Sequence, residues 1–207
     1  MIVIIDYGMG NIASVKNAFE SLGHEAIVTR EHDLIKKATK IILPGVGSFR
    51  KAMEYLKKYD LIHILREKAL VQKTPILGIC LGMQLLADAG EEDTDGGEYT
   101  KGLGLIPGQI LSIKPLDKSY RLPHMGFNGI KIQHESPLLK GIKEDAHFYF
   151  VHSFEYFPEN KSDVIASVEY GNDLVAIVGK DNVFGVQFHP EKSQFVGLKL
   201  LSNFLEF

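Results

Sequence analysis

The first half of the chain alternates short apolar runs with longer amphipathic stretches. The apolar runs are hydrophobic on both faces and short enough to be buried strands; they cover residues 2–5, 26–29, 40–43 and 75–79. Apolar residues at helical spacing fill the intervals and predict helices over residues 11–22, 48–58, 61–71 and 81–89. Such buried strands, separated by helices, predict a parallel sheet that is covered on both sides.

The second half changes to short strands that are closely spaced and joined by turns. We expect them at residues 110–113, 129–133, 147–151, 164–168, 174–178 and 183–188. Their spacing indicates an antiparallel or mixed extension of the sheet. An apolar-rich helix over residues 194–205 ends the chain, and Ser193 is its expected N-cap. The sequence therefore predicts an α/β fold: a three-layer sandwich with a central mixed, mostly parallel sheet and helices on both faces.

Size and composition narrow the class of protein. With 207 residues, the chain is expected to form a single domain over residues 1–207. A net charge of −3 without a basic block gives no reason to expect a nucleic-acid partner, and no apolar run is long enough to span a bilayer. The N-terminus has the pattern of a strand, not of a signal peptide, and a single cysteine excludes an intrachain disulfide. Both features predict a cytoplasmic protein.

The only cysteine, Cys80, lies at the centre of Gly78-Ile79-Cys80-Leu81-Gly82, where the apolar run 75–79 ends. A strand that ends in this pattern and leads into a helix forms a sharp elbow, which exposes the nucleophile at the edge of the sheet. The N-terminus of the following helix favours a negatively charged thiolate. The motif therefore predicts a nucleophilic thiol. The alternative is a small buried hydrophobic residue, which is the usual environment of a lone cysteine.

A candidate base for this thiol follows another apolar run, in His189-Pro190-Glu191. An imidazole can accept the thiol proton and a carboxylate can fix its tautomer, so the three groups are the parts of a cysteine-based acyl-transfer site. The oxyanion of the acyl intermediate needs backbone donors, for which we expect the N–H of Leu81 and a peptide of Gly45-Val46-Gly47. The chain has eight histidines, however, and spacing alone does not select the one that meets Cys80.

A different function class is suggested by the glycines near the N-terminus. Gly8-Met9-Gly10-Asn11-Ile12-Ala13 fits the G-x-G-x-x-A pattern between a strand and a helix, and Glu31 follows about 20 residues later. This pattern is typical of dinucleotide-binding proteins, so a nucleotide-binding module is a rival hypothesis. Asp6-Tyr7 lengthens the turn relative to that fingerprint, and the glycines can simply permit a tight turn.

Six segments together resemble a known family. They are Asp6-Tyr7-Gly8-Met9-Gly10-Asn11, Leu43-Pro44-Gly45-Val46-Gly47-Ser48-Phe49, Gly78-Ile79-Cys80-Leu81-Gly82-Met83-Gln84-Leu85-Leu86, Pro123-His124-Met125-Gly126-Phe127-Asn128, Tyr149-Phe150-Val151-His152-Ser153-Phe154 and Gly185-Val186-Gln187-Phe188-His189-Pro190-Glu191-Lys192-Ser193. In this order the segments resemble the triad-type, class I glutamine amidotransferases. Within these, residues 44–49 and 123–128 are similar to the HisH family, the glutaminase subunits of imidazole glycerol phosphate synthase.

The resemblance implies a reaction and the residues that perform it. Cys80 would attack the side-chain amide of glutamine and form a glutamyl thioester. His189, oriented by Glu191, would protonate the departing ammonia and then activate water to release glutamate. The glutamine would be held by Gln84, by the backbone of Gly45-Val46-Gly47 and by the backbone of His152-Ser153-Phe154. No cofactor is implied, and the scattered histidines give no spacing expected of metal ligands.

The resemblance also implies a partner. Ammonia would pass, shielded from water, to a HisF-type cyclase of (β/α)₈ fold in a heterodimer, which serves histidine biosynthesis. Contacts with this partner would lie around Asn11, Phe127, Tyr149 and Lys192. The family usually has tryptophan where this chain has Phe127, and commonly tyrosine where it has Phe154. The first difference leaves open an alternative, a paralogue that supplies ammonia to another synthase, such as one forming amidino groups on sugars.

Overall fold

A computed structural model describes residues 1–94, 96–116 and 119–207 of the chain. Over these residues a sheet of nine strands has the order β2-β1-β3-β4-β13-β12-β11-β8-β9. Five strands pair in parallel: β2 (Ala26–Thr29), β1 (Ile2–Ile5), β3 (Lys40–Gly45), β4 (Ile76–Cys80) and β13 (Val183–Val186). Antiparallel pairing continues the sheet through β12 (Asp173–Lys180), β11 (Val164–Glu169), β8 (His124–Ile132) and β9 (His147–His152). The sheet is therefore mixed, as the sequence predicts.

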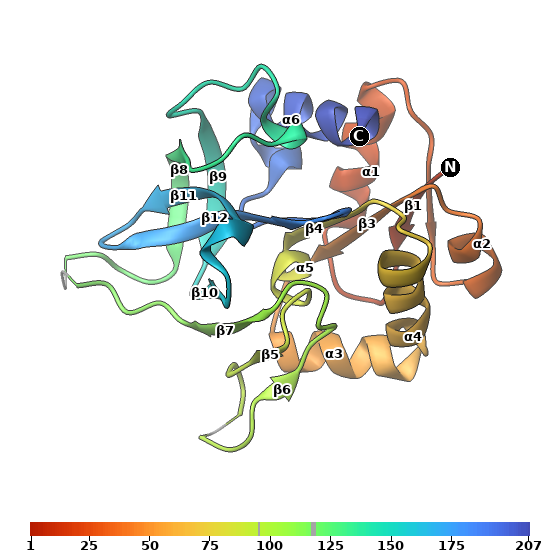
Figure 1. The fold of residues 1–207 in the computed structure, drawn as a ribbon, viewed down its shortest axis with the longest axis horizontal. Helices are drawn as coiled ribbons and strands as arrows, with labels where there is room; N and C mark the ends of the chain where they lie inside the picture. Colours follow the sequence, from red (N-terminus) through yellow and green to blue (C-terminus); the bar gives the residue numbers. More distant parts are fainter. Residues whose placement is uncertain (95, 117–118) are drawn as a thin grey trace.

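Helices cover both faces of this sheet (Figure 1). One face carries α1 (Ile12–Ser21) and α6 (Gln194–Glu206). The other carries α3 (Phe49–Lys58) and α4 (Leu61–Arg66), which continues into a π-helical turn at Glu67–Val71. The short helix α2 (His32–Lys36) packs on α4, and 3₁₀ turns occur at Pro137–Leu139, Lys161–Asp163 and Pro190–Lys192. The predicted three-layer α/β sandwich is confirmed.

A second, smaller sheet lies on the same side as α3 (Figure 1). Its order is β10-β7-β5-β6, formed by β10 (Phe154–Pro158), β7 (Gly108–Ser112), β5 (Ala89–Gly90) and β6 (Thr100–Lys101). β10 follows directly after β9, so the residues between them turn from the large sheet into the small one. This turn matters for the site, because it places Ser153 beside the carboxyl ends of the parallel strands.

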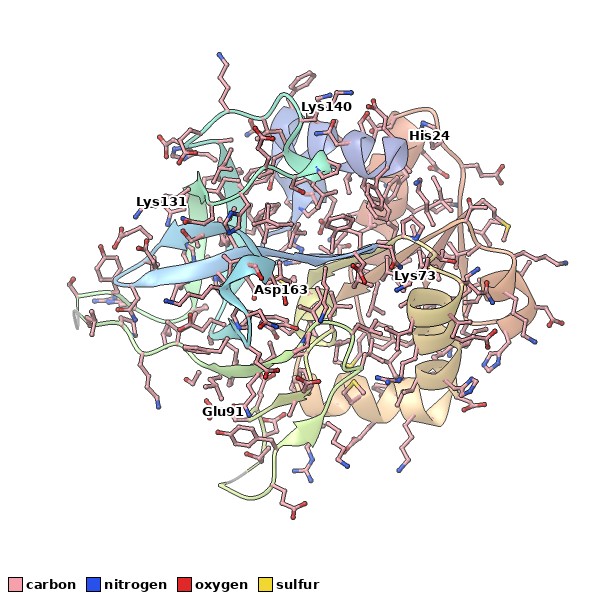
Figure 2. All side chains as sticks on the ribbon, in the orientation of Figure 1. His24, Lys73, Glu91, Lys131, Lys140 and Asp163 are labelled. Atoms are coloured by element: carbon pink, nitrogen blue, oxygen red, sulfur yellow. The ribbon has the colours of Figure 1, made fainter. Side chains whose placement is uncertain are left out.

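Two hydrophobic cores hold the layers together, one on each face of the sheet. Alternating residues of one strand contribute to different cores: Ile4 belongs to the core beneath α1 and α6, and Ile5 to the core beneath α3 and α4. This alternation follows from the pleat of a strand that is buried on both faces. Figure 2 shows side chains filling both layers, whereas the exposed side chains of Lys131 and Lys140 lie at the edge of the molecule.

Most strand ends agree with the sequence prediction to within one or two residues, but the helix after Cys80 does not. We predicted it over residues 81–89, whereas α5 is only Leu81–Gln84. The carbonyls of Leu85, Leu86 and Ala87 instead accept hydrogen bonds from backbone N–H groups of residues 103–106. These long-range bonds replace further helical turns, so the dipole at Cys80 is that of a single turn.

Two other expectations need correction. Ser193 precedes α6, but its hydroxyl does not cap the helix: it donates to the carbonyl of His189 at 2.6 Å and accepts from the N–H of Tyr149 at 2.9 Å. Strand β10 was not predicted at all.

In the part of the chain that the structure describes, no helix combines the length and the apolar character that crossing a bilayer requires.

Candidate active site

The backbone at Cys80 makes the sharp turn that the sequence predicts. Cys80 is the last residue of β4, and α5 begins at the next residue. Its φ is 54° and its ψ is −113°, a combination that side-chain-bearing residues rarely adopt. Strain of this kind persists only where the surrounding structure imposes it, and it is concentrated at functional sites.

Close packing of backbone around the turn imposes this geometry. A Cβ atom on Gly82 would lie 1.7 Å from the carbonyl oxygen of Leu43, and one on Gly78 would lie 2.5 Å from the carbonyl oxygen of Gly82. Neither position has room for a side chain, so both glycines of the motif are required sterically. The elbow therefore packs closely against β3 on one side and against α5 on the other.

His189 reaches the elbow because β13 pairs in parallel with β4. Three residues after this strand, the N–H of His189 donates to the carbonyl of Tyr149 at 2.9 Å. The side chains of His189 and Glu191 are 2% and 1% exposed, and Nδ1 of the histidine lies 2.8 Å from Oε1 of the carboxylate. A buried carboxylate in this position fixes the tautomer that turns Nε2 away from it.

The surroundings of His189 favour its protonated form. Burial lowers the pKa of His189, but interactions with Cys80 and Glu191 outweigh burial and raise it to about 9. Nε2 is buried and has no partner of good hydrogen-bond geometry among the described residues, although Cys80 is close enough to affect its charge. A histidine held as imidazolium beside a cysteine is the arrangement of an activated thiol, and such contacts are often loose before substrate binds.

A cleft of about 520 Å³ opens beside the thiol. It gathers most of the residues predicted to act on a substrate: Val46, Gly47, Cys80, Leu81, Gln84, His152, Ser153, Phe154 and His189. Gly45 pairs with Cys80 in the ladder between β3 and β4, and Glu191 lies behind His189. The structure therefore brings the predicted nucleophile, base and oxyanion donors to one place.

Three residues around the cleft were given no role from the sequence. Gln187 is fully buried; its Oε1 accepts from Gln84 Nε2 at 3.1 Å and its Nε2 lies 3.9 Å from the sulfur of Cys80. Glu92 lines the cleft and its Oε2 accepts from the N–H of Phe49 at 2.7 Å. Pro123 lines the cleft from the β8 side. Gln187 and Pro123 lie in motifs that the sequence displays, whereas nothing in the acidic segment around Glu92 marks it as part of a site.

Three of the four predicted partner contacts form one cluster outside the cleft. Phe127 and Tyr149 face each other across the β8–β9 ladder with ring centroids 5.5 Å apart, and Lys192 Nζ lies 5.8 Å from the Tyr149 ring. Phe127 is 47% exposed. Asn11 is separate from this cluster: it precedes α1, which packs against the turn that contains Lys192.

Other binding chemistry has less support. Among the described residues, no group of three or more His, Cys, Asp or Glu side chains is arranged to hold a metal ion. In the glycine-rich turn after β1, Asp6 is bound to Arg30 at 2.6 Å and to the N–H of Gly8 at 3.1 Å. Both of these partners of the Asp6 carboxylate belong to the protein itself.

Comparison with known proteins decides the family. A family model described as glutamine amidotransferase class-I matches residues 3–206. The chain belongs to this family. The nucleotide-binding hypothesis is thus no longer needed to account for the glycine motif, which is one of the segments that the class-I glutamine amidotransferase resemblance already includes.

Curated relatives are similar along the whole chain. A protein of Methanococcus maripaludis is 47% identical over 206 residues, which cover 100% of this chain and 99% of the relative; one of Nitrobacter winogradskyi is 48% identical, with 99% and 97% covered. Each is named imidazole glycerol phosphate synthase subunit HisH 2. The relative from Geobacillus kaustophilus, named subunit HisH, is 47% identical, with 99% and 96% covered.

Solved structures support the fold. A crystal structure described as a glutamine amidotransferase has a TM-score of 0.76 at 19% identity and covers 100% of this chain and 98% of its own. The structure of PurLQS from Thermotoga maritima has a TM-score of 0.74 at 20% identity, with 99% and 97% covered. At these identities the likeness concerns the class-I amidotransferase fold and not the substrate.

Proposed function

We propose that this protein is the glutaminase subunit of an imidazole glycerol phosphate synthase, and that residues 1–207 act as a single catalytic domain. The observation that carries the proposal is the buried arrangement of Cys80, His189 and Glu191 beside a cleft, in a chain about 47% identical to proteins named as the HisH subunit. The reaction is hydrolysis of glutamine to glutamate and ammonia.

The first half of the reaction forms a thioester. The Cys80 sulfur, as thiolate, attacks the side-chain carbonyl carbon of glutamine, and the carbonyl oxygen becomes an oxyanion. Backbone N–H groups of Leu81 and of Gly45-Val46-Gly47 stabilise this charge. The imidazolium of His189 gives its Nε2 proton to the amide nitrogen, the C–N bond breaks, and ammonia leaves. A raised His189 pKa supports this step, because the proton is already on the histidine at neutral pH.

The second half restores the enzyme. Neutral His189 removes a proton from water, and the hydroxide attacks the thioester carbon. The C–S bond breaks, glutamate leaves, and Cys80 and the imidazolium of His189 return to their starting forms. Glu191 holds the imidazole in place throughout.

Recognition of glutamine uses the polar rim of the cleft. Gln84 donates its amide N–H groups to Gln187 Oε1 at 3.1 Å and to the carbonyl of Phe154 at 3.4 Å, which leaves its own Oε1 available to substrate. The backbone of His152-Ser153-Phe154 forms the facing edge. Glu92 supplies a carboxylate suited to the α-amino group of an amino acid.

The proposed partner is a HisF-type (β/α)₈ cyclase. The cluster of exposed Phe127, half-buried Tyr149 and exposed Lys192 offers an apolar centre with one cation, as protein interfaces commonly do, and Asn11 extends the contact. Ammonia would pass to the cyclase without meeting water and react with a phosphoribulosyl-formimino-carboxamide nucleotide. The products would be imidazole glycerol phosphate and aminoimidazole carboxamide ribonucleotide.

A second candidate function is favoured by one observation. Phe127 occupies a partner-facing position where the family usually has tryptophan, and the chain has no tryptophan at all. A paralogue that delivers ammonia to another synthase, such as one forming amidino groups on sugars, would keep the same cleft and change this surface.

Glutamate release by the chain alone, and with a HisF-type cyclase loaded with its nucleotide, tests the proposal. We expect weak turnover alone and a clear rise with the loaded cyclase. No rise with the cyclase, but a rise with an amidino-sugar synthase, would select the second candidate. Fast turnover without any partner would contradict the proposed coupling, and no turnover under any condition would contradict the glutaminase assignment.

A further inference from the structure

A row of part-buried and buried hydrogen bonds runs from Asn128, on the more buried face of β8, to the edge of the cleft, through side chains that the proposed mechanism does not use. Asn128 Nδ2 lies 3.0 Å from His124 Nε2, and His124 Nδ1 lies 2.9 Å from His152 Nε2. His152 Nδ1 in turn lies 2.8 Å from the carbonyl oxygen of Phe154. His124 and His152 are 1% and 5% exposed.

The carbonyl oxygen of Phe154, at the end of this row of hydrogen bonds, determines which atom donates in each of them. A carbonyl oxygen only accepts, so Nδ1 of His152 carries a proton and donates to Phe154. A neutral His152 then accepts at Nε2, so His124 donates from Nδ1 and accepts at Nε2 from the amide of Asn128. The three side chains therefore form one continuous row, in which each hydrogen bond has only one possible donor.

Burial keeps both rings neutral, as this order requires. It lowers the pKa of His124 to about 3, with a further decrease from the charge of His152. Burial also lowers the pKa of His152 to about 4; the bond to Phe154 opposes this decrease, and the charge of His189 adds to it. Neither ring gains a proton near neutral pH.

Packing also fixes the orientation of the His124 ring. The His124 ring is stacked on Tyr170 at 4.1 Å and on Phe150 at 4.7 Å. Tyr170 donates its hydroxyl to the carbonyl of Arg121 at 2.7 Å. His124 and His152 are also direct partners in the β8–β9 ladder. A ring held on two faces and at both nitrogens has one available orientation.

The two ends of the row lie at functionally different places. The carbonyl of Phe154 accepts from both His152 and Gln84, and it follows Ser153 on the edge of the cleft. At the other end, Asn128 is next to Phe127 of the exposed cluster.

We propose that Asn128, His124 and His152 form a positioning row that holds the backbone of Ser153-Phe154 in the orientation that binds the amino-acid part of glutamine. The inference rests on the proposed function, since it takes the cleft to be the glutamine site. These are positioning residues: they set the affinity for glutamine and leave the reactivity of Cys80 unchanged.

Saturable labelling of Cys80 in the full chain by a diazoketone analogue of glutamine tests the row. His124→Phe keeps an aromatic ring between Phe150 and Tyr170 but leaves His152 Nε2 without a donor. Because a buried acceptor is then unpaired, we expect the half-saturating concentration to rise about tenfold, with a maximal rate within about twofold of wild type. Alkylation by iodoacetamide, which needs no glutamine site, should be unchanged.

A matched control uses the same substitution on the same ladder. His147 pairs with Gly129 across β8 and β9 but is exposed and outside the row, so His147→Phe should label like wild type. An equal half-saturating concentration for His124→Phe and wild type would overturn the proposal. So would a fall in the maximal rate or in iodoacetamide reactivity without a change in half-saturation.

Asn128→Asp gives an independent readout, which stands even where His124→Phe fails to fold. A carboxylate at position 128 requires a proton on His124 Nε2, so the row stays intact only while His124 is an imidazolium. The titratable groups facing His124 are His152 from β9 and Tyr170 after β11. The ratio of half-saturating concentrations, Asn128→Asp to wild type, should therefore exceed one at alkaline pH and fall as the pH is lowered. A ratio of one at every pH would overturn the proposal.

The same experiment also tests the proposed function separately from the positioning row. If the analogue does not label the wild-type chain saturably, or labels a Cys80→Ala chain equally well, the glutamine site is wrong. Saturable wild-type labelling that His124→Phe and Asn128→Asp leave unaffected contradicts the positioning row alone.

Discussion

The two walls of the cleft are built in different ways. The wall formed by β3, β4 and α5 is close-packed backbone, where glycines 78 and 82 leave no space for a side chain. The facing wall, formed by β8, β9 and the start of β10, is held by hydrogen bonds among His124, His152 and Phe154. Steric contacts change abruptly with distance, whereas hydrogen bonds are lost one at a time. We therefore expect all-or-none effects at the first wall and graded effects on substrate affinity at the second.

Apart from loss of the nucleophile itself, the largest effect is expected at Glu191, which lies behind His189. Glu191→Gln keeps a group that can accept from His189 Nδ1 but removes the charge that stabilises the imidazolium. Glutaminase kcat of the complex should fall by about 10²- to 10⁴-fold. Glu54→Gln on the exposed face of α3 is the control and should retain full turnover. Equal rates for both variants would show that Glu191 has no part in the reaction.

Next in size is the effect of Gly82→Ala on the first wall. The new Cβ would overlap the carbonyl of Leu43, so β3 or the elbow must shift, at a cost of about 3 kcal/mol or more in the free energy of unfolding. Gly23→Ala, where φ is +80° but nothing lies within 4 Å, isolates the backbone strain and should cost about 1 kcal/mol. Urea denaturation measures both. Similar values for the two variants would contradict the steric account of the elbow.

The outer edge of the second wall should show a smaller effect. Phe127→Ala removes an exposed ring that packs on Tyr149 and should weaken binding of the cyclase about tenfold, by about 1–2 kcal/mol. Phe157→Ala removes an equally exposed ring from β10 and should leave binding unchanged. Calorimetric titration of the partner compares them. Unchanged affinity for Phe127→Ala would place the interface elsewhere.

The most gradual effect is the dependence of stability on pH. The pKa of His189 is about 9 in the folded protein and near 6.5 in an unfolded chain, so the folded protein binds more protons between these values. The resulting stability is complete below pH 6.5 and is lost as pH rises through 9, by at most about 1.4 kcal/mol per pH unit. His189→Phe should remove this slope from unfolding curves. The same slope in the variant would assign it to another group.

The first wall was largely predictable from sequence, because its signals are local. Strands that are apolar on both faces and the two glycines around Cys80 mark it directly. The early end of α5 could not be predicted, since the carbonyls of Leu85 and Ala87 pair with N–H groups far along the chain. Ser193 resembles an N-cap locally, but its hydroxyl is taken by His189 and Tyr149.

The second wall was less predictable, because its contacts join strands distant in sequence. His124 and His152 are 28 positions apart, and nothing in the sequence shows that their rings meet. Strand β10 was missed for a similar reason: it is defined by its pairing with β7 and not by a pattern of its own. The sequence motifs in this wall point to the family, but they do not show which side chains form hydrogen bonds with each other.

Replacement of the nucleophile tests the central claim most directly. Cys80→Ala retains Cβ and the packing of the elbow but leaves no atom to form the thioester. We predict that glutamate release by its complex with the loaded cyclase falls at least about 10³-fold, while the free energy of unfolding changes little. Glutamate release within tenfold of the wild-type rate would contradict the account.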